Sequence, residues 1–456
     1  MAMPGLIVIL GATGAGKTRL AIDLALEIER IHSRKCEIIN ADVLQCYAGS
    51  PIVTNKATTD EQKGIPHHLI GFADPFQNMK AHSFRDEASE VIRDLDGRGR
   101  QAIVVGGSDY YVKALVSREF DISQVLDGGA DEVDGEASLE QSQTSGKFEA
   151  LSKEAMHELL EEVDPLSAGR LHPNDTRRVR RYLEICETSG KAASALFLEQ
   201  RRSAGECGRL LYDCFFIVVD TEDGTLERHV SKRVDEMLER GLISEVANLY
   251  ALCPNTRHGI MQAIGVSEFE QCDLSATSPR DDETVSRAIE DMKANTIRLA
   301  RKQRRRMLRW LTKCNLETLT VDTTSALKAR YLEADCNETQ VSKPQSFEEV
   351  WRSDVLDPCV NAVSAFLSKD PQAPPRKIAR EDVNLDWQSY QCSICGGRRL
   401  QDQHAWDAHR AGRQHRRRLA TLRKRHPGCT FQIQPDLKGT GTLVFSLTHD
   451  SSLEKS

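Results

Sequence analysis

One segment near the amino end constrains the fold of this chain more than any other. Residues 11–18 read GATGAGKT and fit the pattern G-x-x-x-x-G-K-[S/T], directly after the apolar run Leu6–Leu10 and before the helical stretch Arg19–Arg30. In this setting the glycines let backbone N–H groups turn inward on a phosphate chain, Lys17 neutralises its charge, and Thr18 offers a hydroxyl to Mg²⁺. The segment therefore predicts a phosphate-binding loop between a strand and a helix. It leaves open whether the phosphates belong to a nucleotide or to another diphosphate.

The pattern of apolar runs elsewhere indicates an α/β fold. Cys36–Asn40 and Gln101–Val105 are further runs of strand length, and strands return at Cys214–Asp220 and Glu317–Val321. Apolar strands that alternate with helical stretches predict a parallel sheet covered by helices on both faces. We therefore expect an α/β fold with a phosphate-loop parallel sheet as its core.

Shifts in composition divide the 456 residues into several parts, and the length alone suggests about three domains. Residues 121–147 are rich in Gly, Ser, Asp and Glu with few large apolar side chains, so we expect them to be disordered. We expect a core in 1–120 and 206–329, a helical insertion domain in 121–205, a polar, proline-containing linker in 330–385, a small Cys/His module in 386–428 and a tail in 429–456.

Charge and hydropathy exclude several classes of protein. The chain carries 61 Lys and Arg against 68 Asp and Glu, a net charge of −7, which excludes a bulk polycation but not local basic patches. No apolar run approaches the roughly 18 residues of a membrane-spanning helix, so we expect no membrane partner. Thirteen cysteines, an odd number without a signal peptide, favour a reducing compartment. We expect a cytoplasmic monomer, with mitochondrial and nuclear pools as further locations.

Two polar residues follow strands of the expected sheet. Asp42 comes soon after the strand that ends at Asn40, and Ser108 follows the strand that ends at Val105. Ligands of open parallel sheets gather at the carboxyl ends of the strands, so Asp42 should face the same crevice as Lys17. There a carboxylate and a hydroxyl beside a diphosphate could accept and relay a proton from a nucleophile. The alternative is that Asp42 caps a helix and Ser108 closes a turn.

Seven blocks together resemble the tRNA dimethylallyltransferases, of the eukaryotic kind that has a carboxy-terminal zinc finger. The resemblance covers most of residues 5–312 in the family's order. The matching blocks are GATGAGKT at 11–18, ADVLQCY at 41–47, GIPHHLI at 64–70, VGGSDYYVKAL at 105–115, LHPNDTRRVRRYLE at 171–184, RVDEMLERGLISEV at 233–246 and GIMQAIGVSEF at 259–269. Two positions depart from the family pattern, Val43 for the usual Ser and Tyr182 for the usual Ala, and neither removes a charged or catalytic group.

This resemblance implies a role for each matching residue. Asp42 would be the general base for the target adenine, Ser108 keeps the hydroxyl of the family's usual Thr, and Arg233 would contact the diphosphate. The diphosphate-binding set would be Thr13, Gly14, Ala15, Gly16, Lys17 and Thr18. The tRNA-binding set would be Gln45, Asn174, Asp175, Arg177, Arg178, Arg181, Gln262, Gly265, Arg301, Lys302 and Arg305.

A run of twelve residues, 298–309, contains no acidic side chain and six arginines among its cations. On a helix, Arg298, Lys302, Arg305 and Arg309 fall on one stripe. We interpret the stripe as a contact for RNA phosphates, and the resemblance implies that the aligned helix binds tRNA. A merely solvated face is the alternative.

A zinc-binding pattern lies near the carboxyl end. Cys392, Cys395, His409 and His415 stand at gaps that suit a tetrahedral zinc site, with Trp406 available for a small core. We leave out His404 as a competing ligand because its gap to His409 is less typical. The module resembles the U1-like or matrin-like Cys2His2 zinc fingers, and the basic residues within 416–425 suit RNA contact. Docking to a protein and nuclear targeting are the alternatives.

The resemblance, together with these patterns, implies an Mg²⁺-dependent transferase with a structural Zn²⁺. It would move dimethylallyl from dimethylallyl diphosphate to N6 of the adenosine 3′-adjacent to the anticodon in the tRNA anticodon stem-loop. Three alternatives remain: an adenylate isopentenyltransferase that acts on a free nucleotide, a P-loop kinase or NTPase, and a non-catalytic RNA-binding adaptor. The expected helical insertion, basic helix and finger argue against so small an acceptor as a free nucleotide.

Overall fold

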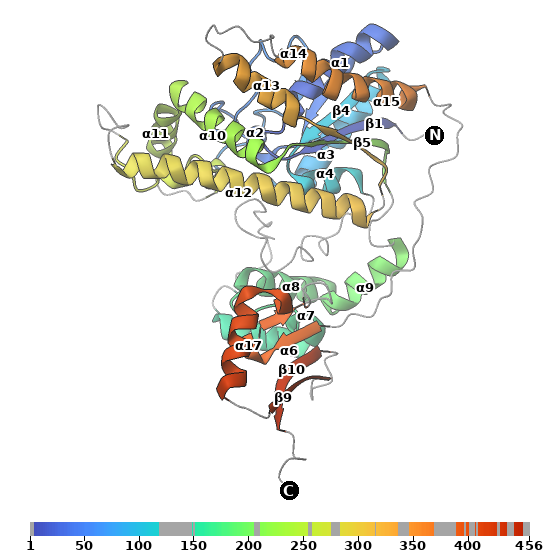
Figure 1. The fold of residues 1–456 in the computed structure, drawn as a ribbon. Helices are drawn as coiled ribbons and strands as arrows, with labels where there is room; N and C mark the ends of the chain where they lie inside the picture. The colour runs from blue at the N-terminus through green and yellow to red at the C-terminus, as the bar shows by residue number, and fades with distance from the viewer. Residues whose placement is uncertain are drawn as a thin grey trace. The chain divides into compact units, whose positions relative to one another are not determined.

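A six-stranded parallel sheet forms the centre of the first part of the molecule in the computed structural model (Figure 1). The strand order is β3-β2-β4-β1-β5-β6, so β1, which leads into the phosphate loop, lies between β4 and β5. The bounds are β1 Gly5–Gly11, β2 Cys36–Asn40, β3 His67–His68, β4 Gln101–Gly106, β5 Asp213–Asp220 and β6 Thr318–Asp322. The parallel register brings the carboxyl ends of β1, β2 and β4 to one edge, as the α/β prediction requires.

The structure describes residues 4–117, 148, 151–204, 210–253, 258–274, 283–314, 316–335, 346–368, 389–395, 398–400, 406, 409–425, 429–435 and 442–449. These residues divide into two compact units. The first takes in the described residues within 1–121 and 206–379, and the second those within 141–205 and 380–456. Residues 121–147, which we expected to be disordered, lie outside the described part.

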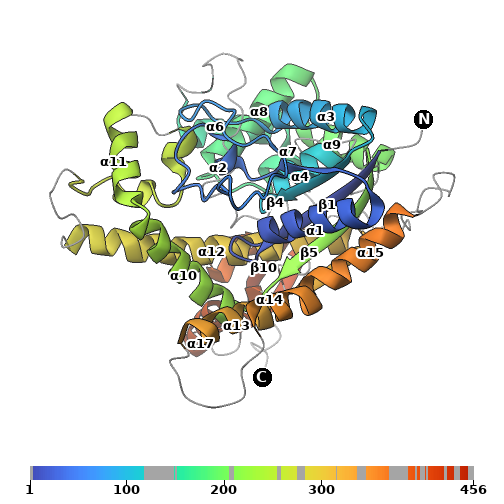
Figure 2. The ribbon, with the colours of Figure 1, turned by 90° about the horizontal axis from the view of Figure 1, so that it is seen from above.

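Side chains of the central strands alternate between the two faces of the sheet. On β1, Leu6, Val8 and Leu10 pack into one apolar cluster, and Ile7 and Ile9 pack into the other. Full burial of such a side chain contributes about 1.5–3 kcal/mol, which explains why strands buried on both faces are apolar throughout. The first face is covered by α3 Ala81–Gly97, α4 Asp109–Val116, α10 Asp223–Glu239, α11 Leu242–Leu252 and α12 Glu283–Lys313, and the second by α1 Lys17–His32, α13 Thr324–Asp335 and α14 Phe347–Val350 with the elements that follow it (Figure 2).

The expected linker is where the structure differs most from the sequence analysis. Within 330–385, residues 346–368 form α14, a π-helical turn at Trp351–Leu356 (η4) and α15 Asp357–Leu367. Trp351 is buried at 2% exposure in the apolar cluster of α1, and its Nε1 donates a hydrogen bond to Asp23 at 3.0 Å. This segment therefore completes the core instead of spanning two domains.

The helical insertion was expected from its sequence, and the described residues there form four helices: α6 Lys153–Val163, α7 Pro165–Ala168, α8 Thr176–Ser189 and α9 Ala193–Ala204. Asp164 is buried at 1% exposure and joins two of them. Its carboxylate accepts hydrogen bonds from the backbone N–H groups of Ser167, at the start of α7, and Ser194, in α9. These charge-assisted bonds satisfy backbone donors at helix ends that would otherwise be left unpaired.

The carboxy-terminal module is larger than its Cys/His pattern indicated. Its four-stranded sheet has the order β8-β7-β10-β9, and β9 and β10 come from the segment we expected to be a tail. The bounds are β7 Ser389–Cys392, β8 Arg398–Leu400, α17 Arg413–Arg425, β9 Cys429–Pro435 and β10 Thr442–His449. Among the described residues, no helix has both the length and the apolar character needed to cross a membrane.

Candidate active site

The phosphate loop joins β1 to α1, and its backbone conformation explains the glycines. Gly14 and Gly16 have φ values of +85° and +95°, in the left-handed region of backbone conformation that residues with a Cβ atom rarely adopt. Lys17 opens α1, and its Nζ donates to the carbonyl oxygen of Ala12 at 2.8 Å. Burial lowers the pKa of Lys17 to about 8; the nearby Asp42 carboxylate raises it and Arg233 lowers it. The loop thus holds its lysine beside a second cation and a carboxylate.

Asp42 follows β2 and is held by its neighbour Asn40. The Asn40 carboxamide accepts a hydrogen bond from the Asp42 N–H at 3.0 Å, and donates to the Asp42 carbonyl at 2.9 Å and the Leu69 carbonyl at 3.1 Å. The Asp42 carboxylate accepts from the N–H of Leu44 at 3.1 Å and caps the short helix α2, Val43–Cys46. Burial raises the pKa of Asp42, against the opposing charge of Lys17. Asp42 therefore caps a helix, as the alternative interpretation held, and also lies in the electrostatic field of Lys17.

Arg233 reaches the phosphate loop from α10. Its Nη2 donates to the Thr13 hydroxyl at 3.0 Å, and burial lowers its pKa while Asp42 acts in the opposite direction. The buried Nε has no hydrogen-bond partner among the described residues. A buried guanidinium N–H without an acceptor is costly, so this donor suits an anionic ligand.

Ser108 is the N-cap residue of α4, but its side chain makes no capping hydrogen bond. Its hydroxyl is buried and has no hydrogen-bond partner among the described residues. The alternative for Ser108 was that it closes a turn, and its backbone carbonyl does accept hydrogen bonds from the N–H groups of Tyr111 and Val112 at 3.1 and 3.3 Å. The hydroxyl is instead available for a ligand.

Gln303 is a site residue that the sequence analysis missed. It lies on α12, is 6% exposed, and its Oε1 accepts a hydrogen bond from the Thr13 N–H at 2.8 Å. A Cβ at Gly107 would lie 2.9 Å from the Gln303 Nε2, so Gln303 touches both the phosphate loop and the end of β4. The only sequence signal for Gln303 was that it is an uncharged polar residue inside the basic run 298–309.

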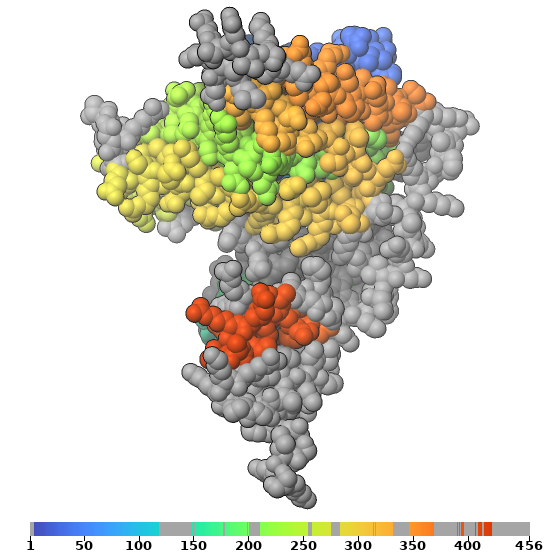
Figure 3. Space-filling model, viewed as in Figure 1, coloured from blue at the N-terminus to red at the C-terminus, as the bar shows by residue number. Residues whose placement is uncertain are grey.

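The basic run lies within α12, whose outer side is part of the molecular surface beside α10 (Figure 3). Arg304 binds Asp220 through two hydrogen bonds of 2.7 and 2.9 Å, and Arg306 forms a 3.2 Å ion pair with Asp109. Arg301 pairs with Glu227 on α10. The predicted stripe faces outward: Arg298, Arg305 and Arg309 are exposed and Lys302 is half-buried. The helix therefore separates structural arginines from surface cations.

Comparison with known proteins agrees with this geometry. The sequence model of the IPP transferase family matches residues 45–311. The chain is 32% identical to tRNA dimethylallyltransferase 2 of Arabidopsis thaliana, over 90% of this chain and 91% of the relative. It is also 32% identical to the tRNA dimethylallyltransferase of Mus musculus, over 92% of this chain and 86% of the relative.

The chain belongs to the IPP transferase family. A solved structure of a eukaryotic dimethylallyltransferase acting on tRNA is similar to it, with a TM-score of 0.65 and 26% identity over 92% of this chain and 98% of that one. The resemblance stated from the sequence blocks is confirmed, and so is the α/β fold.

Residues that the family resemblance assigns to tRNA lie in several places in the first unit. Gln45, on α2, donates to the carbonyl of Asn55 at 3.3 Å, and Gln262 ends a short 3₁₀ turn, Gly259–Gln262. Gly265 has a φ of +95°, and a Cβ there would lie 2.8 Å from Val53, so this glycine is required by packing. Their contacts with RNA stay a prediction.

In the helical insertion, the residues predicted to bind tRNA surround the start of α8. Asp175 caps the helix, accepting from the Arg178 N–H at 3.3 Å, and forms a 3.2 Å ion pair with the buried Arg178 side chain. Arg181 pairs with Glu184 at 3.2 Å, and Asn174 is exposed. The side chain of Arg177 lies outside the described part. Arg178 thus stabilises the insertion, and Asn174 is the more accessible member of the set.

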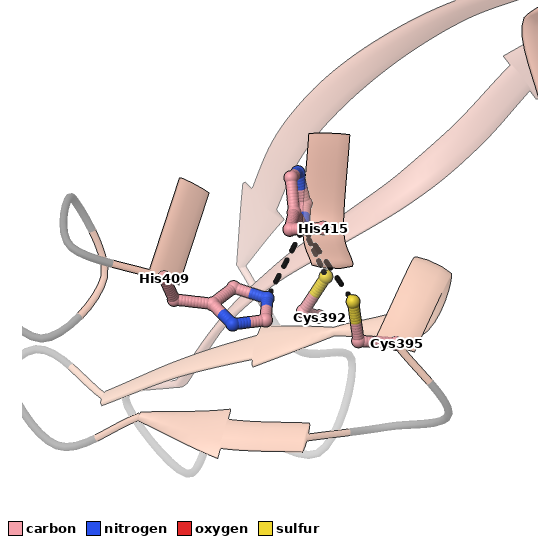
Figure 4. Close-up of side chains that lie close together, drawn as sticks. All are labelled: Cys392, Cys395, His409 and His415. Atoms are coloured by element: carbon pink, nitrogen blue, oxygen red, sulfur yellow. Dashed lines mark hydrogen bonds between the residues drawn. The ribbon is translucent and has the colours of Figure 1, made fainter. Parts of the chain in front are cut away.

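The four predicted zinc ligands of this IPP transferase come together (Figure 4). Their ligand atoms all lie within 4.8 Å of one another, and the His415 Nδ1 lies 3.5 Å from Cys392 Sγ, 3.6 Å from Cys395 Sγ and 3.1 Å from His409 Nε2. These distances fit ligands arranged around one zinc ion with bonds of about 2.0–2.3 Å. The Trp406 ring stacks between Tyr390 and His409 and forms the expected small core. His404 lies outside the described residues.

Proposed function

We propose that this protein transfers a dimethylallyl group from dimethylallyl diphosphate to N6 of the adenosine 3′-adjacent to a tRNA anticodon, and releases diphosphate. The family membership and the names of the relatives support the reaction class. One observation carries the proposal: Lys17 of the phosphate loop and Arg233 of α10, both half-buried, share an electrostatic site with the Asp42 carboxylate. A diphosphate and an amine nucleophile need opposite charges side by side, and this edge of the sheet supplies both.

In the proposed reaction one bond forms and one breaks at the first carbon of the prenyl group. The adenine N6 lone pair forms the N–C bond while the C–O bond to the diphosphate breaks and its electron pair stays on oxygen. N6 then loses a proton, and the Asp42 carboxylate accepts it. An exocyclic amine whose lone pair is delocalised into the ring is a poor nucleophile, so the transfer needs help at both ends.

At the leaving end, cations stabilise the charge that develops on the diphosphate. Lys17 and Arg233 are half-buried, and charge–charge interactions are stronger there than in bulk water. The Thr18 hydroxyl follows Lys17 at the start of α1, where it would hold an Mg²⁺ ion. Bound there, Mg²⁺ would supply further neutralisation of the leaving group.

At the attacking end, Asp42 orients the amine and takes its proton. Its pKa lies above the ordinary aspartate range because of burial, which makes it a stronger base than an exposed aspartate. Asn40 fixes the backbone on either side of this carboxylate. General-base catalysis of this kind contributes about 10²–10⁴-fold to the rate.

The acceptor is proposed to be a whole tRNA and not a free nucleotide. An adenine in a loop must leave its stack to reach Asp42, at a cost of a few kcal/mol. The surface cations of α12 and the zinc module, which would hold a structural Zn²⁺, provide phosphate contacts that can offset this cost. We propose that the protein acts as a monomer in the cytoplasm, with mitochondrial and nuclear pools.

A transfer assay tests the proposal. The full chain is incubated with labelled dimethylallyl diphosphate, Mg²⁺ and total tRNA, and the modified nucleoside is identified by mass spectrometry. We expect label in N6-dimethylallyladenosine of tRNA and none in adenosine monophosphate. Label on the free nucleotide would support the adenylate isopentenyltransferase, and consumption of ATP without prenyl transfer would support a kinase or NTPase.

A further inference from the structure

We propose that Gln303 is a further residue of the site that binds the prenyl diphosphate. Its amide nitrogen donates a hydrogen bond to the diphosphate, while its carbonyl oxygen accepts a hydrogen bond from the phosphate loop. The inference rests on the proposed function, because it concerns the same diphosphate. The inference assigns Gln303 to the binding of dimethylallyl diphosphate, whereas the surface cations of the same basic run are assigned to RNA. The juxtaposition of Gln303 with Thr13 and Gly107 carries it.

The carbonyl of Gln303 is already engaged. Its Oε1 accepts the Thr13 N–H at 2.8 Å, across 290 positions of sequence, and the Thr13 hydroxyl in turn accepts from Arg233. These two bonds link α12, the phosphate loop and α10 in a chain of three residues. Because a carboxamide is planar, fixing its oxygen on Thr13 also fixes the direction of its NH₂ group.

The amide nitrogen faces the carboxyl edge of the sheet. A Cβ built at Gly107 would lie 2.9 Å from Nε2, so the nitrogen lies against the segment between β4 and Ser108. Two other donors there, the Ser108 hydroxyl and the Arg233 Nε, are buried without a partner among the described residues. Buried donors that the protein itself leaves unpaired indicate a ligand with several acceptor oxygens, and a diphosphate is such a ligand.

Burial argues against an RNA contact for Gln303. The side chain is 6% exposed, whereas the predicted phosphate-contacting residues Arg298 and Arg305 on the same helix are exposed. Helix α12 thus presents cations to its outer side and one amide to the phosphate loop. An uncharged donor here adds a hydrogen bond without a third cation beside Lys17 and Arg233; burial, and after it the charge of Arg233, already lower the pKa of Lys17.

Two substitutions separate the role of the carbonyl oxygen of the Gln303 side chain from that of its amide nitrogen. Gln303→Glu keeps an oxygen that can accept the Thr13 N–H but replaces the amide donor with a carboxylate oxygen. Gln303→Leu has a similar volume and loses both bonds. Binding of dimethylallyl diphosphate and of inorganic diphosphate is measured by calorimetry, with tRNA affinity and thermal unfolding measured on the same preparations.

We expect both variants to weaken binding of the two diphosphates at least tenfold, as for the loss of a hydrogen bond to a charged ligand, and to leave tRNA affinity within about twofold. A Gln303→Glu protein that binds both diphosphates like the wild type would overturn the inference, because the Thr13 bond alone would then account for Gln303. Loss of tRNA affinity with unchanged diphosphate binding would also overturn it and assign the residue to RNA.

A double-mutant cycle supplies a second test. Gly107→Ala places a methyl group against the Gln303 amide and should weaken diphosphate binding several-fold in the wild-type background. In a Gln303→Ala background the methyl group has room, so the same change should have little further effect. Additive effects of the two changes would contradict a shared role.

The wild-type protein distinguishes failure of the inference from failure of the proposed function. If it transfers dimethylallyl to tRNA and the Gln303 variants bind donor normally, the inference alone is wrong. If the wild type neither binds dimethylallyl diphosphate nor transfers it, the proposed function is wrong, and the inference falls with it.

Discussion

Two half-buried cations, Lys17 and Arg233, and the half-buried Asp42 carboxylate lie together beyond the ends of β1 and β2, and the Asp42 carboxylate raises the pKa of both cations. Lys17 loses its proton more readily than an exposed lysine because burial and the charge of Arg233 both disfavour its charged form. Asp42 holds a proton more readily than an exposed aspartate because burial disfavours its charge more than Lys17 favours it. A diphosphate bound to the loop would restore the charge balance on the cation side.

These shifts predict the pH dependence of the free enzyme. Lys17 loses its charge as the pH rises through about 8, so affinity for dimethylallyl diphosphate should fall above that pH instead of near the ordinary lysine value of about 10.4. Lys17→Arg should remove this alkaline decline, because guanidinium stays charged. On the acid side, kcat/KM should fall as Asp42 is protonated, at a pH above that of an exposed aspartate. Donor affinity that stays constant up to pH 10 in the wild type would contradict the account.

Local pattern was enough to predict some site residues and not others. The phosphate loop is one continuous segment, and Asp42 and Ser108 follow strands whose parallel order brings their ends together, so spacing and topology located them. Gln303 reaches Thr13 from 290 positions away, and no local pattern encodes that contact. The same holds for Arg304 and Arg306, which belong to the basic run but not to the predicted stripe, and which bind Asp220 and Asp109.

At the scale of elements, α12 has a different role on each of its two sides. One side packs against α10 and α4 and forms ion pairs with the buried Asp109 and the half-buried Asp220, and the other presents cations to the surface. A helix turns by about 100° per residue, so neighbouring arginines must fall on different sides. Counting charges in the run therefore overstates the number of side chains available to RNA.

Charge reversal on the outer side of α12 tests this division. Lys302→Glu should weaken tRNA binding and lower the slope of log affinity against log salt by about one unit, because one phosphate contact is lost. Arg93→Glu on α3 changes the net charge equally at another exposed position and serves as the matched control, with an unchanged slope expected. Filter binding of tRNA across a salt series measures both. Equal slopes for Lys302→Glu and the wild type would remove α12 from the proposed RNA surface.

The helices at 346–368 were not predicted because composition alone indicated a linker in this region. The flanking residues are polar and contain several prolines, which favoured a linker, yet a short apolar segment inside them carries Trp351. That indole packs in the cluster of α1, and a Cβ at Gly16 of the phosphate loop would lie 3.1 Å from its ring. The segment lies beyond the family match at 45–311, so this chain supports its phosphate loop with an element outside that match.

Trp351→Ala should destabilise the first unit by about 3–5 kcal/mol, the usual cost of a large aromatic-to-alanine change in a core. Trp351→Phe keeps an aromatic ring and loses the hydrogen bond to Asp23, so its cost should be smaller. The exposed neighbour Arg352, changed to Ala, should shift stability by no more than about 0.5 kcal/mol. Denaturant unfolding measures all three, and a Trp351→Ala protein as stable as the Arg352 control would show that the segment is not part of the core.

At the scale of the whole molecule, the chain combines a sheet-based core with a Cys/His module that could hold a metal ion, and strands β9 and β10 complete the sheet of that module. Strand β7 carries Cys392 and pairs with β10, more than fifty positions later. The Cys and His spacing predicted the ligands, because metal sites follow local gaps. The contribution of 429–449 depends on a long-range strand pairing and was therefore missed.

Removing residues 429–456 should lower the zinc affinity of the protein, because β7 would lose the partner that holds Cys392 in place. Cys392→Ser should abolish binding of the one zinc ion, about one equivalent per chain, and both changes should leave binding of dimethylallyl diphosphate unchanged. Competition with a chromophoric chelator measures zinc affinity, and calorimetry measures donor binding. Zinc affinity that is unaffected by the deletion would mean that the module ends before β9.

Donor binding compared with chemistry in an Asp42→Asn protein tests the central claim most directly. Asparagine keeps an oxygen to cap α2 through the Leu44 N–H but has no carboxylate to accept a proton from N6. The account predicts that single-turnover transfer to tRNA falls by about 10²–10⁴-fold while the affinity for dimethylallyl diphosphate, measured at pH 7, is retained. Transfer at the wild-type rate, or a loss of donor affinity as large as the loss of rate, would contradict a site in which the loop holds the donor and Asp42 serves the acceptor.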